Sequence, residues 1–166
     1  VLGQQVTVKA ATTVAGRFVS AFGEPIVTPF AELNRVTPEA ARVAGARLQE
    51  LTPLGITAAR AGCIIALARM YASGAMPVDG PCASPEAAIA RLAALPGIGP
   101  WTAHYIAMRA LRWPDAFPKE DLIVRRRLGG VTPAAAEALS QAWRPWRSYA
   151  VMLLWRTRQR HAVIRL

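Results

Sequence analysis

The sequence has little cysteine and histidine, and this limits the redox and metal chemistry open to it. Its 166 residues include two cysteines, Cys63 and Cys82, and two histidines. Two cysteines cannot supply a disulfide framework or the four ligands of an iron–sulfur cluster, so we expect both to be inert thiols. His104 and His161 lie far apart and outside any HExxH-type motif. We therefore expect two structural or surface histidines, no metal cluster and no resident cofactor.

Several other patterns are also missing. No run of about 18 uncharged apolar residues occurs, so we expect a soluble, cytoplasmic protein that does not bind a membrane. The start lacks the ordered regions of a signal peptide. No nucleophile elbow, Walker loop or dinucleotide fingerprint is present. No stretch alternates apolar and polar residues as a strand would, which predicts one all-α domain over residues 1–166, a compact bundle of about seven to nine short helices.

Acidic residues are scarce, and the balance of charge is strongly basic. There are 10 Asp and Glu against 20 Lys and Arg, for a formal net charge of +10. Nearly all the cations are arginines, whose planar fork matches phosphate. Neutralising phosphates releases counterions, so this excess favours a nucleic acid partner. A solubilising surface charge is the alternative explanation.

Helix starts are marked by a threonine or serine followed by proline. The side-chain oxygen caps a free backbone N–H, and proline fits the first helical position. This pattern stands at Thr37-Pro38, Ser84-Pro85 and Thr132-Pro133. Apolar spacing predicts a first helix over residues 1–22 with no cap, so we expect the chain to begin inside an element. Further helices are expected over residues 37–49, 56–71, 101–111, 121–128 and 143–158.

The stretch around residues 95–121 is the most informative part of the sequence. Residues 95–99, Leu-Pro-Gly-Ile-Gly, form a tight turn, and Pro100 suits the start of the following helix. A helix N-terminus presents backbone N–H groups to an anion, and Gly97 and Gly99 would let another backbone approach closely. The turn is therefore a candidate phosphate site, although such turns often only connect two helices.

Acidic and aromatic side chains follow this turn. Asp115, Glu120 and Asp121 precede the run Arg125-Arg126-Arg127, which is either a solvated face or a nucleic acid contact. Asp121 suits a helix N-cap, where the dipole favours its negative charge. Trp101 and Tyr105 are neighbours on one helix face, a spacing typical of a core but also of a flat apolar wall.

As a set, these residues resemble the HhH-GPD superfamily of helix-hairpin-helix DNA glycosylases. The resemblance covers essentially the whole chain and is closest to the 3-methyladenine DNA glycosylase II, or AlkA-like, branch. It rests on Leu2-Gly3-Gln4-Gln5, residues 95–105, residues 117–121, and residues 143–150 with Trp155.

The resemblance implies a role for each of these residues. Asp121 would be the catalytic aspartate, which stabilises the oxocarbenium-like sugar and orients the attacking water. A flipped-out base would lie against Trp101, Tyr105 and Trp155. DNA would be contacted by Gln4, Gln5, Leu95, Gly97, Ile98, Gly99 and Thr102, with Gln5 at the wedge that fills the vacated stack. The carbonyls of Ala93, Leu95 and Ile98 would bind a monovalent cation when DNA is present.

Position 101 indicates the kind of reaction. Relatives with lyase activity carry a lysine where this chain has Trp101, and many hold an iron–sulfur cluster. The resemblance therefore implies a monomeric, monofunctional enzyme that removes alkylated purines, such as 3-methyladenine and 7-methylguanine, from duplex DNA.

Two departures leave alternatives open. The wedge position holds Gln5 instead of a large aliphatic residue, and we expect the β-rich N-terminal domain of the family to be absent from these 166 residues. In some bacteria the module is fused to a methyl-acceptor repair protein. The alternatives are a non-catalytic DNA-binding module, a glycosylase of the same fold for oxidised or mismatched bases, and an α-helical protein-interaction domain.

Overall fold

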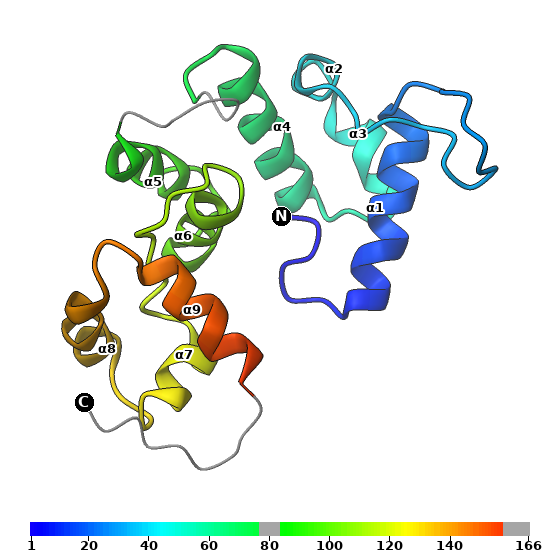
Figure 1. Cartoon of the computed structure of the whole chain (residues 1–166). Coiled ribbons are helices and arrows are strands. Elements are labelled where there is room, and N and C mark those ends of the chain that lie inside the picture. Colours follow the sequence, from blue (N-terminus) through cyan, green and yellow to red (C-terminus); the bar gives the residue numbers. More distant parts are fainter. Residues whose placement is uncertain (77–83, 158–166) are drawn as a thin grey trace. The chain divides into compact units, whose positions relative to one another are not determined.

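A computed structural model describes residues 1–76 and 84–157, and the regular secondary structure of these residues is almost entirely helical (Figure 1). They form nine α-helices and two short 3₁₀-helices, with a single isolated β-bridge between Pro25 and Arg35. The predicted all-α fold is confirmed. None of the helices in these two ranges combines the length and hydropathy needed to cross a membrane. The described residues group into two compact units, residues 1–76 with 94–98, and residues 84–93 with 99–157.

The first unit is built on helices α1 to α4. Helices α2 (Ala40–Ala44) and α3 (Leu48–Leu51) pack against α4 (Ala58–Ala72), and a 3₁₀-helix, Thr52–Leu54, packs against α1 (Val8–Phe22). Their apolar side chains form a buried cluster made by Phe22, Val43, Ala46, Leu51, Ile56, Ala61 and Ile65.

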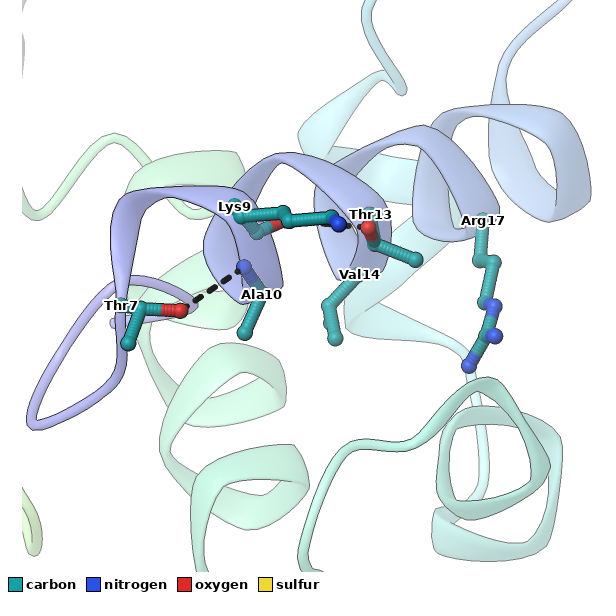
Figure 2. Close-up of a pocket in the computed structure, with 6 residues that line it drawn as sticks. All are labelled: Thr7, Lys9, Ala10, Thr13, Val14 and Arg17. Carbon is teal, nitrogen blue, oxygen red and sulfur yellow. Dashed lines mark hydrogen bonds between the residues drawn. The ribbon is translucent and has the colours of Figure 1, made fainter.

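The prediction of a helix over residues 1–22 is wrong at its start. Helix α1 begins at Val8, and the Thr7 hydroxyl accepts the Ala10 backbone N–H at 3.2 Å (Figure 2). Residues 1–6 instead make a turn, in which Gln5 has a positive φ of 53°. Apolar spacing continues through the turn, but a threonine cap offers the first helical N–H groups a partner and so sets the boundary.

The helix predicted over residues 37–49 is also different in the structure. It starts at Ala40, with Glu39 and not Thr37 at the N-cap, and ends at Ala44 before Gly45. A second helix, α3 (Leu48–Leu51), begins at Leu48, where the Glu50 carboxylate accepts the Arg47 backbone N–H at 2.9 Å. Glycine is a poor helix former, and the hydrogen bond from the Arg47 N–H to Glu50 favours the start of a new helix over an extension of the first.

The second unit contains helices α5 to α9. Helix α5 (Pro85–Ala93) packs against α6 (Pro100–Arg109), and α7 (Leu122–Arg127) packs against α8 (Pro133–Ser140) and α9 (Arg147–Arg156). A 3₁₀-helix, Gln141–Trp143, precedes α9. The buried cluster of this unit is formed by Ala88, Ala107, Met108, Leu111, Ala116, Phe117, Val124, Ala136, Val151 and Leu154.

Most helix boundaries predicted for the second unit are confirmed. Thr132 caps α8 by accepting the Ala135 N–H at 3.2 Å. Gly129 and Gly130, with φ of 95° and 78°, follow α7 and end it as expected. The last helix starts four residues later than predicted, at Arg147, and its described part ends at Arg156, whereas Arg158 lies outside the described residues.

Candidate active site

The carboxylate of Asp121 lies at the start of α7, where the sequence predicts an N-cap. Its Oδ1 atom accepts the Val124 backbone N–H at 2.8 Å, which confirms this assignment. The residue is only 6% exposed. A buried carboxylate needs hydrogen-bond donors, and the N-terminus of a helix supplies both a donor and a favourable dipole.

Two tryptophans from different helices supply further donors to the same carboxylate. Trp101 of α6 donates its indole N–H to Asp121 Oδ2 at 2.7 Å, and Trp155 of α9 donates its indole N–H to Oδ1 at 3.2 Å. Each carboxylate oxygen thus has at least one donor, and the group is held in one orientation. The sequence identified all three residues, but it carried no signal for these two hydrogen bonds.

Aromatic rings extend from this carboxylate along the surface of the unit. The rings of Trp101 and Tyr105 are stacked, with centroids 5.3 Å apart and an angle of 20° between their planes. The ring centroids of Tyr105 and Trp155 are 6.0 Å apart. Trp101 and Tyr105 are each 37% exposed. The pair is therefore not a core pair, and its rings are available to a flat ligand.

This arrangement combines an oriented negative charge with an exposed aromatic surface. A planar, electron-poor ring can stack on Trp101 and Tyr105, because aromatic faces attract cations. A carboxylate fixed beside that surface can stabilise positive charge that develops on an adjoining atom. The geometry therefore suits a ligand in which a flat base is attached to a group that becomes positive.

The turn of residues 95–98 belongs to the first unit. The Ile98 N–H bonds the Leu95 carbonyl at 3.0 Å, and Ile98 is buried. Gly97 has a φ of 90°, and a Cβ placed on it would lie 3.3 Å from the Cβ of Cys63, so both backbone and packing favour glycine here. Gly99, which caps α6, has an ordinary φ of −79°, and a Cβ on it would meet no heavy atom within 4 Å. This open space at Gly99 would let the backbone of a bound molecule come close to the start of α6.

The other predicted DNA contacts differ in their exposure. Gln5 is exposed, and Gln4 is half-buried with its amide donating to the Gly97 carbonyl at 3.1 Å. Thr102, in the first turn of α6, is only 9% exposed, so its side chain lies largely in the interior of the unit. The DNA contacts of these residues remain predictions.

The cation site expected at three backbone carbonyls also remains a prediction. The Leu95 carbonyl already accepts the Ile98 N–H, although a carbonyl oxygen can accept a second partner. Ala93 belongs to the second unit, while Leu95 and Ile98 belong to the first. Over residues 1–76 and 84–157, no group of three or more His, Cys, Asp or Glu side chains is placed to hold a metal.

The arginine run on α7 is partly engaged within the fold. Arg125 donates its Nε–H to the Val131 carbonyl at 2.8 Å, and Arg127 donates to the Thr157 carbonyl. Arg126 is exposed. Two of the three arginines are therefore hydrogen-bonded within the fold, and the run is only partly solvated. Arg126 is its best candidate for a phosphate contact.

Cys63 is buried, and His104 is half-buried with its Nδ1 atom buried. Cys63 is 3% exposed, and burial raises the pKa of its thiol, which fits the expected inert thiol. Cys82 and His161 lie outside the described residues. Among the described residues, His104 Nδ1 and Glu120 Oε2 are buried atoms for which no hydrogen-bond partner is found.

His104 is expected to make stability depend on pH. Burial lowers its pKa below the usual 6.5, and the negative charges of Glu120 and Glu137 only partly oppose this shift. The unfolded chain therefore takes up a proton at a higher pH than the folded chain. The free energy of unfolding should be constant above about pH 7 and fall on acidification from about pH 6.5, by at most about 1.4 kcal/mol per pH unit.

Chemical denaturation from pH 5 to 8 would measure this slope, and His104→Gln supplies the control. The variant should lose the part of the slope that begins near the histidine's unfolded pKa. Equal slopes in the two proteins would show that His104 does not titrate differently on folding.

Comparison with known proteins places this chain in a family. The model of the family described as HhH-GPD superfamily base excision DNA repair protein matches residues 1–148. The probable bifunctional transcriptional activator/DNA repair enzyme AlkA of Mycobacterium tuberculosis is 44% identical over 165 residues, covering 95% of this chain and 32% of that protein. DNA-3-methyladenine glycosylase 2 of Escherichia coli is 36% identical over 157 residues, covering 95% of this chain and 55% of that protein.

The fold is also found among solved structures. The 3-methyladenine DNA glycosylase Mag1 of Schizosaccharomyces pombe, in complex with abasic DNA, aligns with a TM-score of 0.68 at 24% identity, covering 93% of this chain and 74% of that one. This likeness shows the fold alone. The chain spans about a third of the mycobacterial relative and about half of the Escherichia coli one. The matched family model covers most of the chain, and the chain belongs to the HhH-GPD superfamily of base excision DNA repair proteins.

Proposed function

We propose that this chain is the glycosylase domain of a DNA repair enzyme that hydrolyses the N-glycosidic bond of alkylated purines, such as 3-methyladenine and 7-methylguanine, in duplex DNA. The observation that carries the proposal is the Asp121 carboxylate, bonded by the indole N–H groups of Trp101 and Trp155 beside exposed aromatic rings. The names of the bacterial relatives, which include a DNA-3-methyladenine glycosylase, support this substrate class.

The aromatic surface would select the base. A base must leave the stack before it can reach Asp121, and flipping costs a few kcal/mol, least for a damaged pair. Purines alkylated at N3 or N7 carry positive charge, which the ring faces of Trp101 and Tyr105 attract. The same charge makes the base a good leaving group, so no strong acid is required at the base.

Asp121 would act on the sugar. When the C1′–N bond breaks, its electron pair leaves with the base and C1′ becomes oxocarbenium-like and positive. The carboxylate stabilises that charge and orients a water molecule, whose oxygen adds to C1′ while its proton passes to the carboxylate or to solvent. Trp101 stands where lyase relatives hold a lysine nucleophile, so we propose a monofunctional reaction that ends at an abasic site and uses no resident cofactor.

The remaining features support a DNA partner. The net charge of +10 favours a polyanion, and the turn of residues 95–99 leads into α6, whose N-terminus can meet a phosphate. We propose a monomer that works on duplex DNA in the bacterial cytoplasm. Whether the domain acts alone or needs the further sequence that its longer relatives possess is answered by the same assay.

Base release is the test of this proposal. The purified chain is incubated with methylated duplex DNA and, separately, with duplexes that carry oxidised or mismatched bases. Released 3-methyladenine, 7-methylguanine and the other bases are separated and quantified. We expect release of both bases and a steep fall in DNA affinity as salt is raised. Salt-sensitive binding to abasic-analogue DNA without any release would favour a non-catalytic DNA-binding module, and release of only oxidised or mismatched bases would correct the substrate class.

A further inference from the structure

Gln4 is held in the first unit by one hydrogen bond from its side chain and one to its backbone. Its side-chain amide donates to the Gly97 carbonyl at 3.1 Å, across 93 positions of sequence. Its own backbone carbonyl accepts a hydrogen bond from the Arg60 guanidinium on α4. The residue therefore links the N-terminal turn both to the body of the unit and to the turn of residues 95–98.

The turn of residues 95–98, which accepts the Gln4 side-chain hydrogen bond, has a restricted conformation. Gly97 adopts a left-handed conformation and packs over Cys63, which is on α4 like Arg60, and the Ile98 N–H closes the turn on Leu95. Because the turn already rests on α4, a bond to its Gly97 carbonyl holds Gln4 to a fixed point. The turn of residues 95–98 can therefore fix the position of Gln4 through this hydrogen bond.

Gln5, the residue after Gln4, has a backbone conformation that needs support from its surroundings. Gln5 is exposed and has a positive φ of 53°, a conformation that a residue with a side chain adopts at some energetic cost. The amino-acid type of Gln5 does not explain its positive φ. The two hydrogen bonds of Gln4 restrict the peptide between Gln4 and Gln5, and so restrict the conformation of Gln5.

We propose that Gln4 is a positioning residue that locks the exposed Gln5 turn to the turn of residues 95–98, so that the two turns present a single preformed surface to DNA. The inference rests on the proposed function, since it assigns Gln5 to the gap left by a flipped base. Its physical basis is preorganisation, because a side chain already held in its bound conformation loses less entropy on binding.

A double-mutant cycle tests this coupling. Affinities are measured for a duplex with a tetrahydrofuran abasic analogue and for the same duplex intact, using the native chain, Gln4→Met, Gln5→Ala and the double variant. Methionine keeps the length of the side chain but removes the donor to Gly97. We expect Gln5→Ala to weaken abasic-analogue binding by about 3- to 10-fold in the native chain and by less than about 2-fold in the Gln4→Met background.

Additional variants exclude a general loss of structure. Gln4→Glu keeps length and polarity but turns an acceptor toward the Gly97 carbonyl, so it should behave as Gln4→Met does. Gln49→Met, at an exposed glutamine of α3 in the same unit, should leave both affinities unchanged. Circular dichroism establishes that each variant keeps its helix content.

Two failures can be told apart. If the native chain shows no preference for abasic-analogue DNA over intact duplex, the proposed function fails and this inference fails with it. If the preference is present but the effects of Gln4→Met and Gln5→Ala simply multiply, the proposed function stands and the positioning role of Gln4 is overturned.

Discussion

Replacing Asp121 with asparagine is expected to lower the single-turnover rate of base release by about 10²- to 10⁴-fold, with DNA affinity almost unchanged. The amide keeps an oxygen that can accept the Val124 N–H and so can preserve the cap of α7. It has no negative charge, and its NH₂ group replaces an oxygen that accepts an indole N–H. The variant therefore loses the field that stabilises the positive sugar while the surrounding helices remain in place.

The neighbouring carboxylate supplies the matched control for this experiment. Glu120→Gln removes the same charge one residue earlier in the chain, and its rate should stay within a few-fold of the native value. Binding to abasic-analogue DNA shows that both variants still engage the product-like complex. A native rate for Asp121→Asn would exclude it as the catalytic group, and a loss as large in Glu120→Gln would show that two carboxylates act together.

Replacing Arg147 with methionine is expected to lower the free energy of unfolding by about 3 kcal/mol or more. Arg147 and Asp115 are 4% and 6% exposed, and the guanidinium forms two bonds to the carboxylate, at 2.7 and 2.9 Å. Removing the arginine leaves Asp115 with a buried negative charge, whose remaining ion-pair partner among residues 1–76 and 84–157 is Arg144 at 3.5 Å. Because small domains have a total stability of about 5–15 kcal/mol, the variant should melt at a markedly lower temperature.

Urea denaturation of the native chain and the variant measures this difference. Arg147→Lys keeps the charge but cannot form the bidentate pair, so its stability should fall between the two. Arg47→Met tests a solvent-exposed pair with Glu50 in the first unit, and no measurable change is expected there. A loss of under about 1 kcal/mol in Arg147→Met would mean that the buried pair only offsets its own desolvation.

How much of the structure the sequence predicts depends on how local the signal is. The caps at Asp121 and Thr132 and the stop at Gly129 are correct because each is decided by hydrogen bonds or dihedral preferences within a few residues. The start of α1 was misplaced because apolar spacing runs past Thr7, and spacing alone carries no boundary. The break at Gly45 was missed for the same reason.

The sequence by itself determined the helical class, the cationic surface, the glycine turn, and the identity of the acid and the three aromatic residues. Only the tertiary structure decided which of these groups meet. Trp101 and Trp155 reach Asp121 across 20 and 34 positions, Arg147 reaches Asp115 across 32, and Gln4 reaches Gly97 across 93. Pairs so distant in sequence are brought together by the packing of whole helices, which no spacing within one segment can encode.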